Sequence, residues 1–563
     1  MSSTTFTSGT VIASTWLNDV NNAVYNTVPS QSSAAGISYA PSGTGAVTTT
    51  VQAKLQQTVS VKDFGAVGDG STDDTAAIQA ALNSGAATIV FPPTSNYYNI
   101  TSGLLVKSNT TIFGYGATLK TTSSSVFNML WAEGTTSAYI SNVNIFGLTV
   151  IGNGASTNVN GNGIGGTYCN NLTVRDCNVQ NVWGQGIFLG GGGINCCFEN
   201  NTISGVYGDG IHIGDQTSGQ ILQYVYLNNN YIYGSYDDGI GITNGAHNVW
   251  VTNNTIDGTT GGAGIDLSGP YNVVCQGNYV RNYGQIGIRV EYFGQDAYDI
   301  QILNNTIDSP PANQAAINLY GPNNTSVATH QNNPITIIGN TVQGILASGT
   351  EGLFITGANN VRVQQNLFSG VTTGITLSGL NPTSSVGPVQ NCDINDNTFI
   401  GLATAIGLSS GNNYFKTFNN RFESVTNYIT TPYTTYAQQP TLWEADYQFE
   451  SVFFKAVSFT TTSTTLAEID ASIRFQGYAG QRVQLFIYAT DTSGAGTGNS
   501  TYTLYDTTNS LTLLTATVNN GASYAWVSTG QTILSQSGLL TVQFGRTASG
   551  GSTTIKSAYL LIG

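Results

Sequence analysis

Apolar and polar residues alternate in short stretches along the middle of this chain, and the pattern returns at a regular interval. An Asn shortly followed by an apolar residue occurs nine times between Asn178 and Asn397 and once more at Asn420, at a mean spacing of about 27 residues. The intervening echoes lie at Asn201, Asn230, Asn254, Asn278, Asn305, Asn340 and Asn366. Alternation with a period of two is typical of β-strands, and a fixed repeat of this length is typical of stacked-repeat proteins. The sequence therefore predicts an all-β solenoid of parallel strands.

A second echo, a Gly-Ile pair that opens an alternating segment, lies between the Asn positions. Stacked strands place equivalent residues about 4.8 Å apart, and successive side chains point to opposite faces. We expect an inward column of Ile187, Ile211, Ile240, Ile265 and Ile288. We expect two outward columns, first Phe188, His212, Gly241, Asp266, Arg289 and Asn318, and then Gly190, Gly214, Thr243, Ser268, Glu291 and Tyr320. The turns before these strands contribute Asp209, Asp238, Ala263 and Ile286, while the Asn echoes are expected to form a ladder of side-chain amides.

Composition narrows the classes of partner. Of 563 residues only 8% are charged, whereas 40% are hydrophobic and there are 68 Gly and 30 Tyr, so the chain is expected to fold rather than to be disordered. A polar, uncharged and aromatic surface suits carbohydrate, although a solvated β surface has the same composition. A net charge of −14, with no Lys from 122 to 415, disfavours nucleic acid as a partner.

Targeting and redox signals are weak. No apolar run is long enough to span a membrane, and the N-terminus has no signal segment. Six cysteines lie inside the repeat without a disulfide framework or a metal-type spacing: Cys169, Cys177, Cys196, Cys197, Cys275 and Cys392. Buried thiols are expected, in a protein made in a reducing cytoplasm.

Residues 1–58 form a leader. A strand over 5–12 and a helix over 16–25, with Ser14 or Thr15 as its N-cap, are expected, and the Ser/Gly-rich stretch 31–50 is expected to be a linker. The small apolar face of the helix, with Trp16 and Val20, suggests packing against another copy or another protein.

A specific motif follows the leader. Residues 59–82 combine a strand, the turn Gly68-Asp69-Gly70 and a predicted helix from Asp74 to Leu82 capped by Thr72 or Asp73. This segment resembles the opening signature of the pectate-lyase superfamily of right-handed parallel β-helices, as found in bacteriophage tailspike depolymerases. The resemblance implies that the helix caps the first turn of the solenoid, and that Asp69, Asp73 and Asp74 are turn and cap residues rather than catalysts.

The resemblance covers roughly residues 1–430 and implies three parts. Residues 1–58 would attach the protein to a phage virion or an adaptor protein, and residues 59–430 would form the β-helix that binds and cleaves substrate. Residues 431–563, with short alternating segments, predict a β-sandwich-like domain for trimerisation or carbohydrate contact. The resemblance further implies a homotrimer in the virion tail, made in the host bacterium and acting at the outer surface of the host cell.

Acidic residues gather on the predicted outward face. Ten lie between Glu199 and Asp299, where composition alone predicts about five. Glycoside hydrolysis needs one protonated carboxyl and one carboxylate, and the stems of Asp266 and Glu291 are expected about 8 Å apart. Asp238 with Asp266, and Asp209 with Asp238, are alternatives. The candidate catalytic residues are therefore Asp238, Asp266, Glu291 and Asp209.

Candidate substrate-binding residues surround these acids: His212, Arg289, Tyr236, Tyr271, Tyr292 and Tyr320. Tyrosine rings suit the apolar faces of sugars. His212 contacts substrate or is a surface residue of the stack, and Arg289 holds Asp266 or an acidic sugar or forms an ordinary surface ion pair. No cofactor and no metal are expected.

The sequence favours a tailspike that hydrolyses a bacterial surface polysaccharide, a capsule or an O-antigen. One alternative is a lyase that acts by β-elimination on a uronate polymer, with His212, Arg289 or Tyr292 as its base or cation. Another is a receptor-binding tail protein without catalytic activity.

Overall fold

A computed structural model describes most of the repeat and parts of both ends of the chain. The described residues are 14–21, 33–154, 161–214, 220, 222–243, 245–291, 297–320, 335–345, 347–378, 389–408, 414–430, 441–442, 452–454, 459–461, 467–468, 475–477, 482–491, 500–518, 525–530, 532–546 and 553–562.

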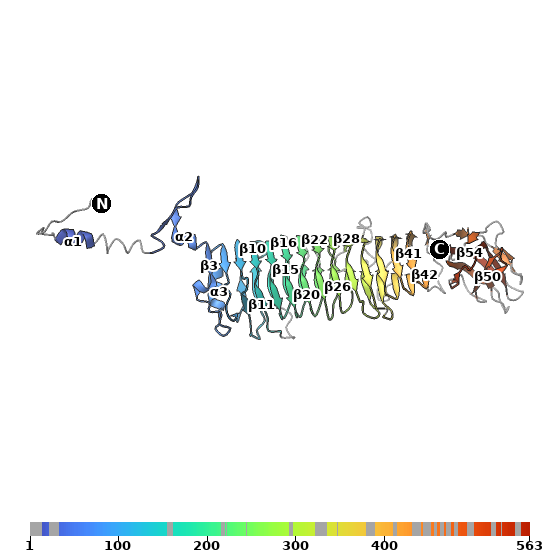
Figure 1. The fold of residues 1–563 in the computed structure, drawn as a ribbon, viewed down its shortest axis with the longest axis horizontal. Coiled ribbons are helices and arrows are strands. Elements are labelled where there is room, and N and C mark those ends of the chain that lie inside the picture. Colours follow the sequence, from blue (N-terminus) through green and yellow to red (C-terminus); the bar gives the residue numbers. More distant parts are fainter. Residues whose placement is uncertain are drawn as a thin grey trace.

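The centre of the molecule is a parallel β-helix built from three long sheets (Figure 1). Each turn of the chain contributes one strand to each sheet, as in β10 (Ile140–Phe146), β11 (Thr149–Ile151) and β12 (Ile164–Thr167). The first sheet has 15 strands, and the second and third have 13 each. The expected parallel solenoid is therefore confirmed.

The third sheet carries the predicted site, so its strands are given in full. In spatial order they are β6 (Leu104–Leu105), β9 (Leu130–Glu133), β12, β15 (Ile187–Gly190), β18 (Ile211–Gly214), β21 (Ile240–Thr243), β24 (Ile265–Ser268), β27 (Ile288–Glu291), β30 (Ala315–Tyr320), β33 (Glu351–Thr356), β36 (Thr373–Ser378), β39 (Thr404–Leu408) and β42 (Asn427–Thr430).

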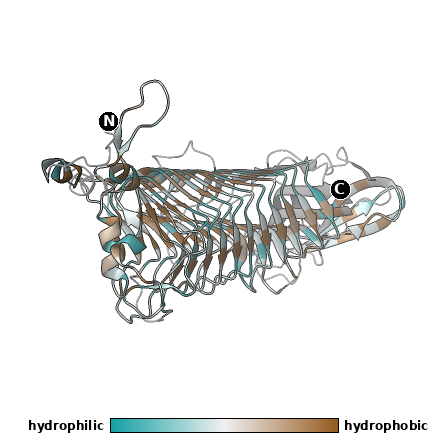
Figure 2. Ribbon diagram, turned by 60° about the vertical axis from the view of Figure 1, so that its left-hand side comes forward, coloured by the Kyte–Doolittle hydropathy of each residue, from teal (hydrophilic) through white to brown (hydrophobic). Residues whose placement is uncertain are grey.

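The core is a set of aliphatic columns that run along the β-helix. The predicted inward isoleucines pair in register from one strand to the next, and all five are fully buried. Figure 2 shows hydrophobic strands repeated along the length of the column. Burial of this continuous apolar surface stabilises a stack whose single turns could not fold alone.

The Asn ladder is confirmed and lies inside the β-helix. From Asn201 to Asn397, each member donates from its backbone N–H and its side-chain amide to the Oδ1 of the next member. Each side-chain amide also donates to a backbone carbonyl. The column consists of Asn201, Asn230, Asn254, Asn278, Asn305, Asn340, Asn366, Asn397 and Asn420. Asn178 was wrongly included. It pairs with Thr202, one position later, and the ladder position on its turn belongs to Cys177, whose N–H donates to Asn201.

The predicted leader is only partly as expected. Helix α1 (Ser14–Asn21) begins and ends earlier than predicted, and the expected strand over 5–12 lies outside the described residues. The stretch expected to be a linker holds a two-stranded hairpin, β1 (Ser38–Tyr39) and β2 (Thr49–Thr50), followed by α2 (Val51–Leu55). Backbone pairing between β1 and β2 orders this Ser/Gly-rich segment, which composition alone does not reveal.

Helix α3 (Thr75–Leu82) packs its buried Ile78, Ala81 and Leu82 at the start of the β-helix, as the resemblance implied (Figure 1). Its N-cap position is Asp74, but the cap contact comes from Asp73, whose Oδ1 accepts from the Thr75 N–H. Thr72 was a wrong candidate for the cap, because its hydroxyl donates to Asp69.

Strands continue beyond the last sequence echoes. β42 and β43 (Thr441–Leu442) extend two of the sheets, so the solenoid pattern passes the predicted boundary at 430. Backbone pairing continues there without the Asn and Gly-Ile signals.

Further on, the described strands form two antiparallel sheets of six and five strands. They include all four predicted segments, as β48 (Arg482–Asp491), β49 (Ser500–Asp506), β53 (Gly538–Arg546) and β54 (Thr553–Ile562). Their role and their packing as a sandwich domain remain predictions.

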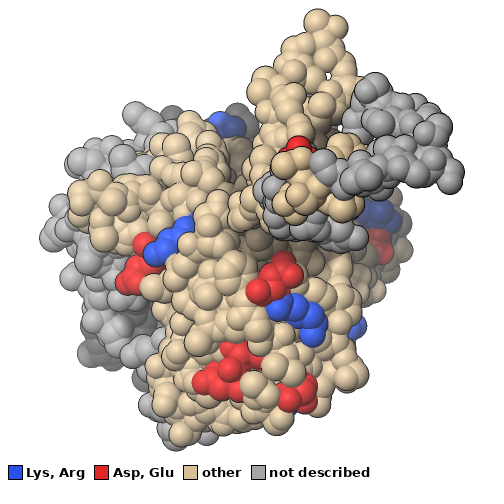
Figure 3. All heavy atoms as spheres, turned by 90° about the vertical axis from the view of Figure 1, so that its left-hand side faces the viewer, with Lys and Arg blue, Asp and Glu red and all other residues tan. Residues whose placement is uncertain are grey.

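The cysteines are free thiols, and five of the six are buried, with Cys197 half-buried. Among the described helices, none has the length and apolar character needed to cross a membrane. The end view in Figure 3 shows few charged side chains, which lie in small groups on a largely uncharged surface.

Candidate active site

The third sheet brings the predicted acids together. Asp266 of β24 pairs in register with Arg289 of β27, and Ser268 pairs with Glu291 two residues on. Asp209 and Asp238 lie at the turns that lead into β18 and β21, where the Gly210 N–H donates to the Asp238 carbonyl. The register inferred from the Gly-Ile echoes is correct. The four candidate acids, from Asp209 to Glu291, lie on adjacent turns of the β-helix.

Arg289 lies at the centre of this cluster. Its Nε donates to Asp266 Oδ1 at 2.8 Å and lies 3.6 Å from Glu291 Oε1, while its Nη2 is 3.7 Å from Asp238 Oδ2. The Arg289 side chain is only 19% exposed, so one guanidinium is shared by three acids in a partly desolvated setting. The expected contact between Arg289 and Asp266 is confirmed as an ion pair.

Ser268 joins two of the acids. Its hydroxyl oxygen lies 2.7 Å from Asp266 Oδ2 and 3.0 Å from Glu291 Oε1. Ser268 and Asp266 are buried, whereas the Glu291 side chain remains 28% exposed. Because the two contacts share one oxygen, Asp266 Oδ2 and Glu291 Oε1 lie within about 6 Å of each other.

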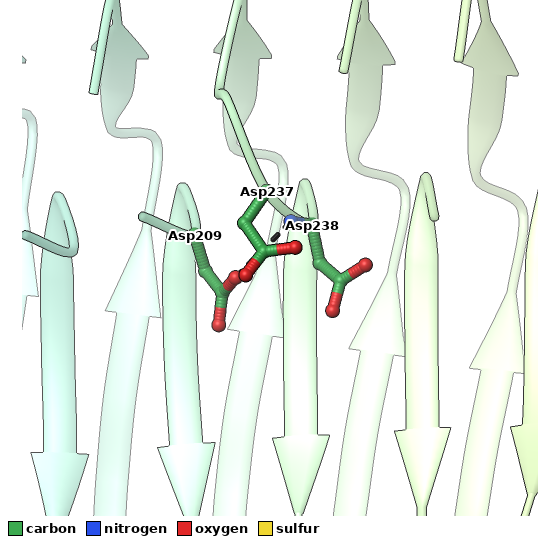
Figure 4. A group of neighbouring side chains, drawn as sticks. All are labelled: Asp209, Asp237 and Asp238. Atoms are coloured by element: carbon green, nitrogen blue, oxygen red, sulfur yellow. Dashed lines mark hydrogen bonds between the residues drawn. The ribbon is translucent and has the colours of Figure 1, made fainter. Parts of the chain in front are cut away.

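A second group of carboxylates lies on the side of the cluster nearest to β18. Figure 4 shows Asp209, Asp237 and Asp238 with their carboxylates gathered at the turns between neighbouring strands. The Asp209 Oδ1 accepts from the Asp238 N–H at 3.1 Å, and its Oδ2 lies 2.5 Å from His212 Nδ1. A carboxylate accepts hydrogen bonds, so this contact places the proton of a neutral His212 on Nδ1 and leaves Nε2 as an acceptor, 3.5 Å from Thr243 Oγ1.

Burial and mutual repulsion shift the acidity of the cluster. Burial, together with the Asp266 and Asp209 carboxylates, raises the pKa of Asp238 to about 9. Burial raises the pKa of Glu291 and the Asp266 carboxylate adds to the shift, whereas Arg289 opposes it, as does a Ser268 hydrogen bond where it is donated to this carboxylate. Burial and the nearby Asp209 raise the pKa of Asp237 as well. Protonated carboxyls at neutral pH are what a general acid requires.

The predicted tyrosines lie along both borders of the acidic face. The exposed ring of Tyr236 stacks on Tyr207 with centroids 4.6 Å apart, at the turns before β18 and β21. On the first sheet, where the chain continues after β24, Tyr271 of β25 (Tyr271–Gln276) stacks between His247 at 4.5 Å and Tyr298 at 4.9 Å.

The remaining substrate candidates are Tyr320, Tyr292 and His212, and among those that the structure describes only His212 contacts the acids named above. Tyr320 is half-buried beside Phe354, with ring centroids 6.3 Å apart, and Tyr292 lies outside the described residues. His212 stacks on Phe188 at 5.4 Å, which in turn stacks on Trp131 at 5.6 Å. An aromatic row therefore leads along the outward column to the acids.

Sequence reasoning missed three members of the site. Asp237 was counted among the acids but not chosen, because its neighbour Asp238 alone fitted the stacking column. Ser268 was placed in the second outward column without a role in the site, and Tyr207 was not among the substrate-binding candidates. The signal for Ser268 was present, since its column also holds Glu291, but a hydroxyl in a strand is common and carries little information.

No cofactor was expected, and the described residues hold one group with metal-compatible geometry. One oxygen from each of Asp209, Asp237 and Asp238 lies within 4.8 Å of the others. Of these carboxylates, Asp209 also contacts His212 and the Asp238 N–H, and Asp238 accepts from the Ala263 N–H.

Comparisons with known proteins agree with the fold. The family model described as "Right handed beta helix region" matches residues 162–342. This chain carries a right-handed β-helix. The handedness, expected from the resemblance, is thus supported by a match that includes the whole acidic cluster.

Among curated relatives, mannuronan C5-epimerase AlgE5 of Azotobacter vinelandii is 27% identical over 278 residues, covering 43% of this chain and 26% of the epimerase. The preneck appendage protein of Bacillus phage PZA is 29% identical over 259 residues, covering 43% of this chain and 29% of the appendage protein. The chain therefore spans less than a third of the length of either relative. A solved structure of a tailspike protein mutant of E. coli bacteriophage HK620, in complex with pentasaccharide, covers 95% of this chain and 99% of its own, with 16% identity and a TM-score of 0.45.

Proposed function

We propose that this protein is a phage tail appendage that binds a bacterial surface polysaccharide and hydrolyses its glycosidic bonds. The observation that carries the proposal is the pair Asp266 and Glu291, two acids on adjacent strands joined by one serine hydroxyl and served by one arginine. Two carboxyls in different protonation states are the chemical requirement for this reaction.

The environments of the two carboxyls suggest their roles. Asp266 is the charged partner, because the Arg289 Nε donates to it directly. Glu291 is more exposed and its pKa is raised, which suits a general acid that must reach a glycosidic oxygen. We assign Asp238, with its own raised pKa and its contact with Arg289, to a hydrogen bond with a sugar hydroxyl beside this pair.

The reaction would then proceed in two balanced steps. Asp266 attacks the anomeric carbon as the carbon–oxygen bond to the leaving group breaks, and Glu291 gives its proton to the leaving oxygen. Water then attacks the same carbon and releases Asp266, while Glu291 takes back a proton from the water. A separation of about 5–5.5 Å is typical of such retaining enzymes, whereas inverting enzymes need about 6.5–9.5 Å. The contacts with Ser268 hold the facing carboxyl oxygens within about 6 Å, short of the inverting range, so we expect retention.

The charge balance of the face favours a sugar without a carboxylate. Among the residues that the structure describes, the ion pairs of this face set five carboxyls, those of Asp209, Asp237, Asp238, Asp266 and Glu291, against Arg289 and, when it is protonated, His212. An oxocarbenium-like transition state carries positive charge, which such a face stabilises. The bordering tyrosine stacks add apolar edges for sugar rings.

Attachment to the virion through residues 1–58, trimerisation and action at the host cell surface belong to the same proposal. They are supported by the similarity to a phage appendage protein and by the capping helix that leads into the β-helix.

The test is incubation of the full chain with purified capsule or O-antigen from a panel of bacteria. Hydrolysis predicts new reducing ends without the ultraviolet absorbance of an unsaturated sugar, and proton NMR of the first products should show a retained anomeric configuration. An inverted anomeric configuration would indicate that Asp238, and not Asp266, works with Glu291. Binding without products would leave a receptor-binding protein.

A second candidate function is proton abstraction next to the carboxylate of a uronate sugar, and a separate observation supports it. The contact between His212 Nδ1 and Asp209 Oδ2, at 2.5 Å, orients the imidazole with Nε2 as a proton acceptor, which suits a general base. Relatives named mannuronan C5-epimerase AlgE5 and, over 67 residues at 46% identity (10% of this chain and 8% of the relative), alginate lyase 7, both of Azotobacter vinelandii, act on uronate polymers by name. An unsaturated product, lost in His212→Ala and kept in Glu291→Gln, would establish this route in place of hydrolysis.

A further inference from the structure

The hydroxyl of Ser268 has too few protons for both of its contacts. It lies 2.7 Å from Asp266 Oδ2 and 3.0 Å from Glu291 Oε1, and the residue is only 3% exposed. A hydroxyl donates one hydrogen bond, and an ionised carboxylate can only accept. With both acids ionised, one contact would press an oxygen lone pair against a carboxylate in a buried site, which costs free energy. The geometry therefore requires a proton on one of the two acids.

The neighbouring contacts decide which acid holds that proton. Asp266 Oδ1 accepts from the Arg289 Nε at 2.8 Å, so its charged form is already bonded. Glu291 lies farther from the guanidinium, at 3.6 Å. The ordered arrangement is Glu291 O–H donating to Ser268 Oγ, and Ser268 O–H donating to Asp266 Oδ2.

We propose that Ser268 is a positioning residue that keeps a single proton on the Asp266–Glu291 pair and stores it on Glu291. The inference rests on the proposed hydrolysis, whose general acid it identifies by hydrogen-bond direction. It assigns a role to a residue that touches both acids and that need not touch the reacting sugar.

The same hydroxyl can serve both halves of the reaction by turning. When Glu291 has given its proton to the leaving oxygen, Asp266 is bonded to the sugar and no longer needs a donor. The Ser268 O–H then turns to donate to the Glu291 carboxylate. When water returns a proton to Glu291, the hydroxyl turns back toward Asp266. Ser268 never loses its proton, so the exchange is balanced without a further reagent.

The charged and titratable groups that face this pair are few. Arg289 lies on the same strand as Glu291. Asp238, at the turn before β21, contacts the Arg289 guanidinium at Nη2. On the other side, β30 contributes Asn318 beside Arg289, and Tyr320 is its one titratable residue. None of these takes the place of a hydroxyl between the two carboxyls.

The test compares Ser268→Ala with Ser268→Thr in the full chain. Thr is a suitable conservative variant, because Thr243 occupies the paired position on the preceding strand. In Ser268→Ala the basic limb of the kcat/KM pH profile should move about one unit toward acid and kcat should fall about tenfold, because the singly protonated pair loses its bridge. Ser268→Thr should restore both.

A matched control is Thr356→Val, three strands further along the same sheet, where the buried hydroxyl has no hydrogen-bond partner. It should leave the profile unchanged. Circular dichroism of each variant would confirm that the β-helix is folded.

A second readout needs no substrate. Carbon-13 NMR of the Glu side-chain carboxyls, with Glu291 assigned through Glu291→Gln, should show Glu291 titrating at lower pH in Ser268→Ala than in the wild type or in Ser268→Thr. A Glu291 titration that is unchanged, or that moves to higher pH, in folded Ser268→Ala would overturn the inference, even if the wild type cleaves polysaccharide. A shifted titration in a protein that cleaves nothing would instead keep the proton bridge and reject the proposed hydrolysis.

Discussion

Two groups of acids on this molecule have opposite surroundings. Asp69, Asp73 and Asp74 lie at the turn before α3, and backbone amides meet them: the Asp74 carboxylate, buried with 1% exposure, accepts from the N–H groups of Val67 and Gly68. The acids of the third sheet instead meet one another. Hydrogen bonds from Thr72 and Ser71 lower the pKa of Asp69, whereas burial and neighbouring carboxylates raise that of Asp238 to about 9.

The difference shows that residue type and burial alone do not mark a site. Asp74 and Asp238 are both buried aspartates, but the first completes a turn and the second lies where protonation is favoured. A carboxylate satisfied by amides is a structural part of the fold. A carboxylate that must share protons with its neighbours is available for chemistry. Three carboxylates of the third sheet lie in this situation around Arg289.

The largest effect should come from removing one proton-carrying acid. Glu291→Gln or Asp266→Asn should reduce cleavage by about 10³-fold, because each removes a catalytic carboxyl at nearly constant shape. Polysaccharide binding should persist in both. The matched variant Asp69→Asn removes a carboxylate from the turn and should leave the rate of release of reducing ends unchanged. Full activity in both cluster variants would exclude this pair.

Removal of the central cation, Arg289, should destabilise the acidic cluster of the third sheet. Arg289→Met leaves Asp266 without its ion-pair partner in a partly buried setting, and should reduce the free energy of unfolding by about 3–5 kcal/mol at neutral pH. The loss should shrink in acid, where the carboxyls are protonated. Urea denaturation at neutral and at acidic pH measures this loss. An equal, small loss at the two pH values would show that these acids form an ordinary solvated face. The exposed pair Arg421–Glu423 offers a control, in which Arg421→Met should change little.

The turn acids should matter for stability alone. Asp74→Ala leaves the N–H groups of Val67 and Gly68 without their acceptor and should cost about 2 kcal/mol. The activity per folded molecule should be that of the wild type. A fall in activity at unchanged stability would place the capping turn in the site and remove the contrast between the two groups.

A smaller effect should appear in the pH dependence of stability. The folded pKa of Asp238 is raised above the unfolded value, so this group favours folding in acid, and that contribution is lost as pH rises toward about 9. Asp238→Asn should therefore flatten the decline of Tm between pH 5 and pH 9. Asp69 has a lowered pKa, and its contribution is present above the unfolded pKa and lost in acid. The same slope in Asp238→Asn and wild type would show that Asp238 titrates normally.

Much of the site could be predicted from the sequence because strand stacking converts sequence spacing into distance. The pairing of Asp266 with Arg289 needed only the alignment of the Gly-Ile echoes, since side chains alternate with a strict period of two. Asn178 shows the limit of such matching. It resembles the other Asn echoes, but it lies one residue out of register, and a shift by one reverses the direction of a side chain.

The turns were harder to predict, because they follow no period. Asp237 and Asp238 are consecutive in the chain, and both reach the same group of carboxylates as Asp209 (Figure 4). No alternation rule places two neighbouring residues on one side, so only one of them was selected. The hairpin of β1 and β2 likewise depends on long-range pairing within a stretch whose composition favours a linker.

The sequence by itself determined the parallel β-helix, its inward isoleucines, the Asn ladder and the face on which acids gather, because each follows from a repeated spacing and from the geometry of a strand. Only the tertiary structure decided which acids share a hydroxyl, which one Arg289 bonds and which are met by amides. Those contacts join residues about 25 positions apart and depend on side-chain direction at single sites, which a repeat does not encode. Protonation follows from these contacts, and with it the division between acids that build the fold and acids proposed to act.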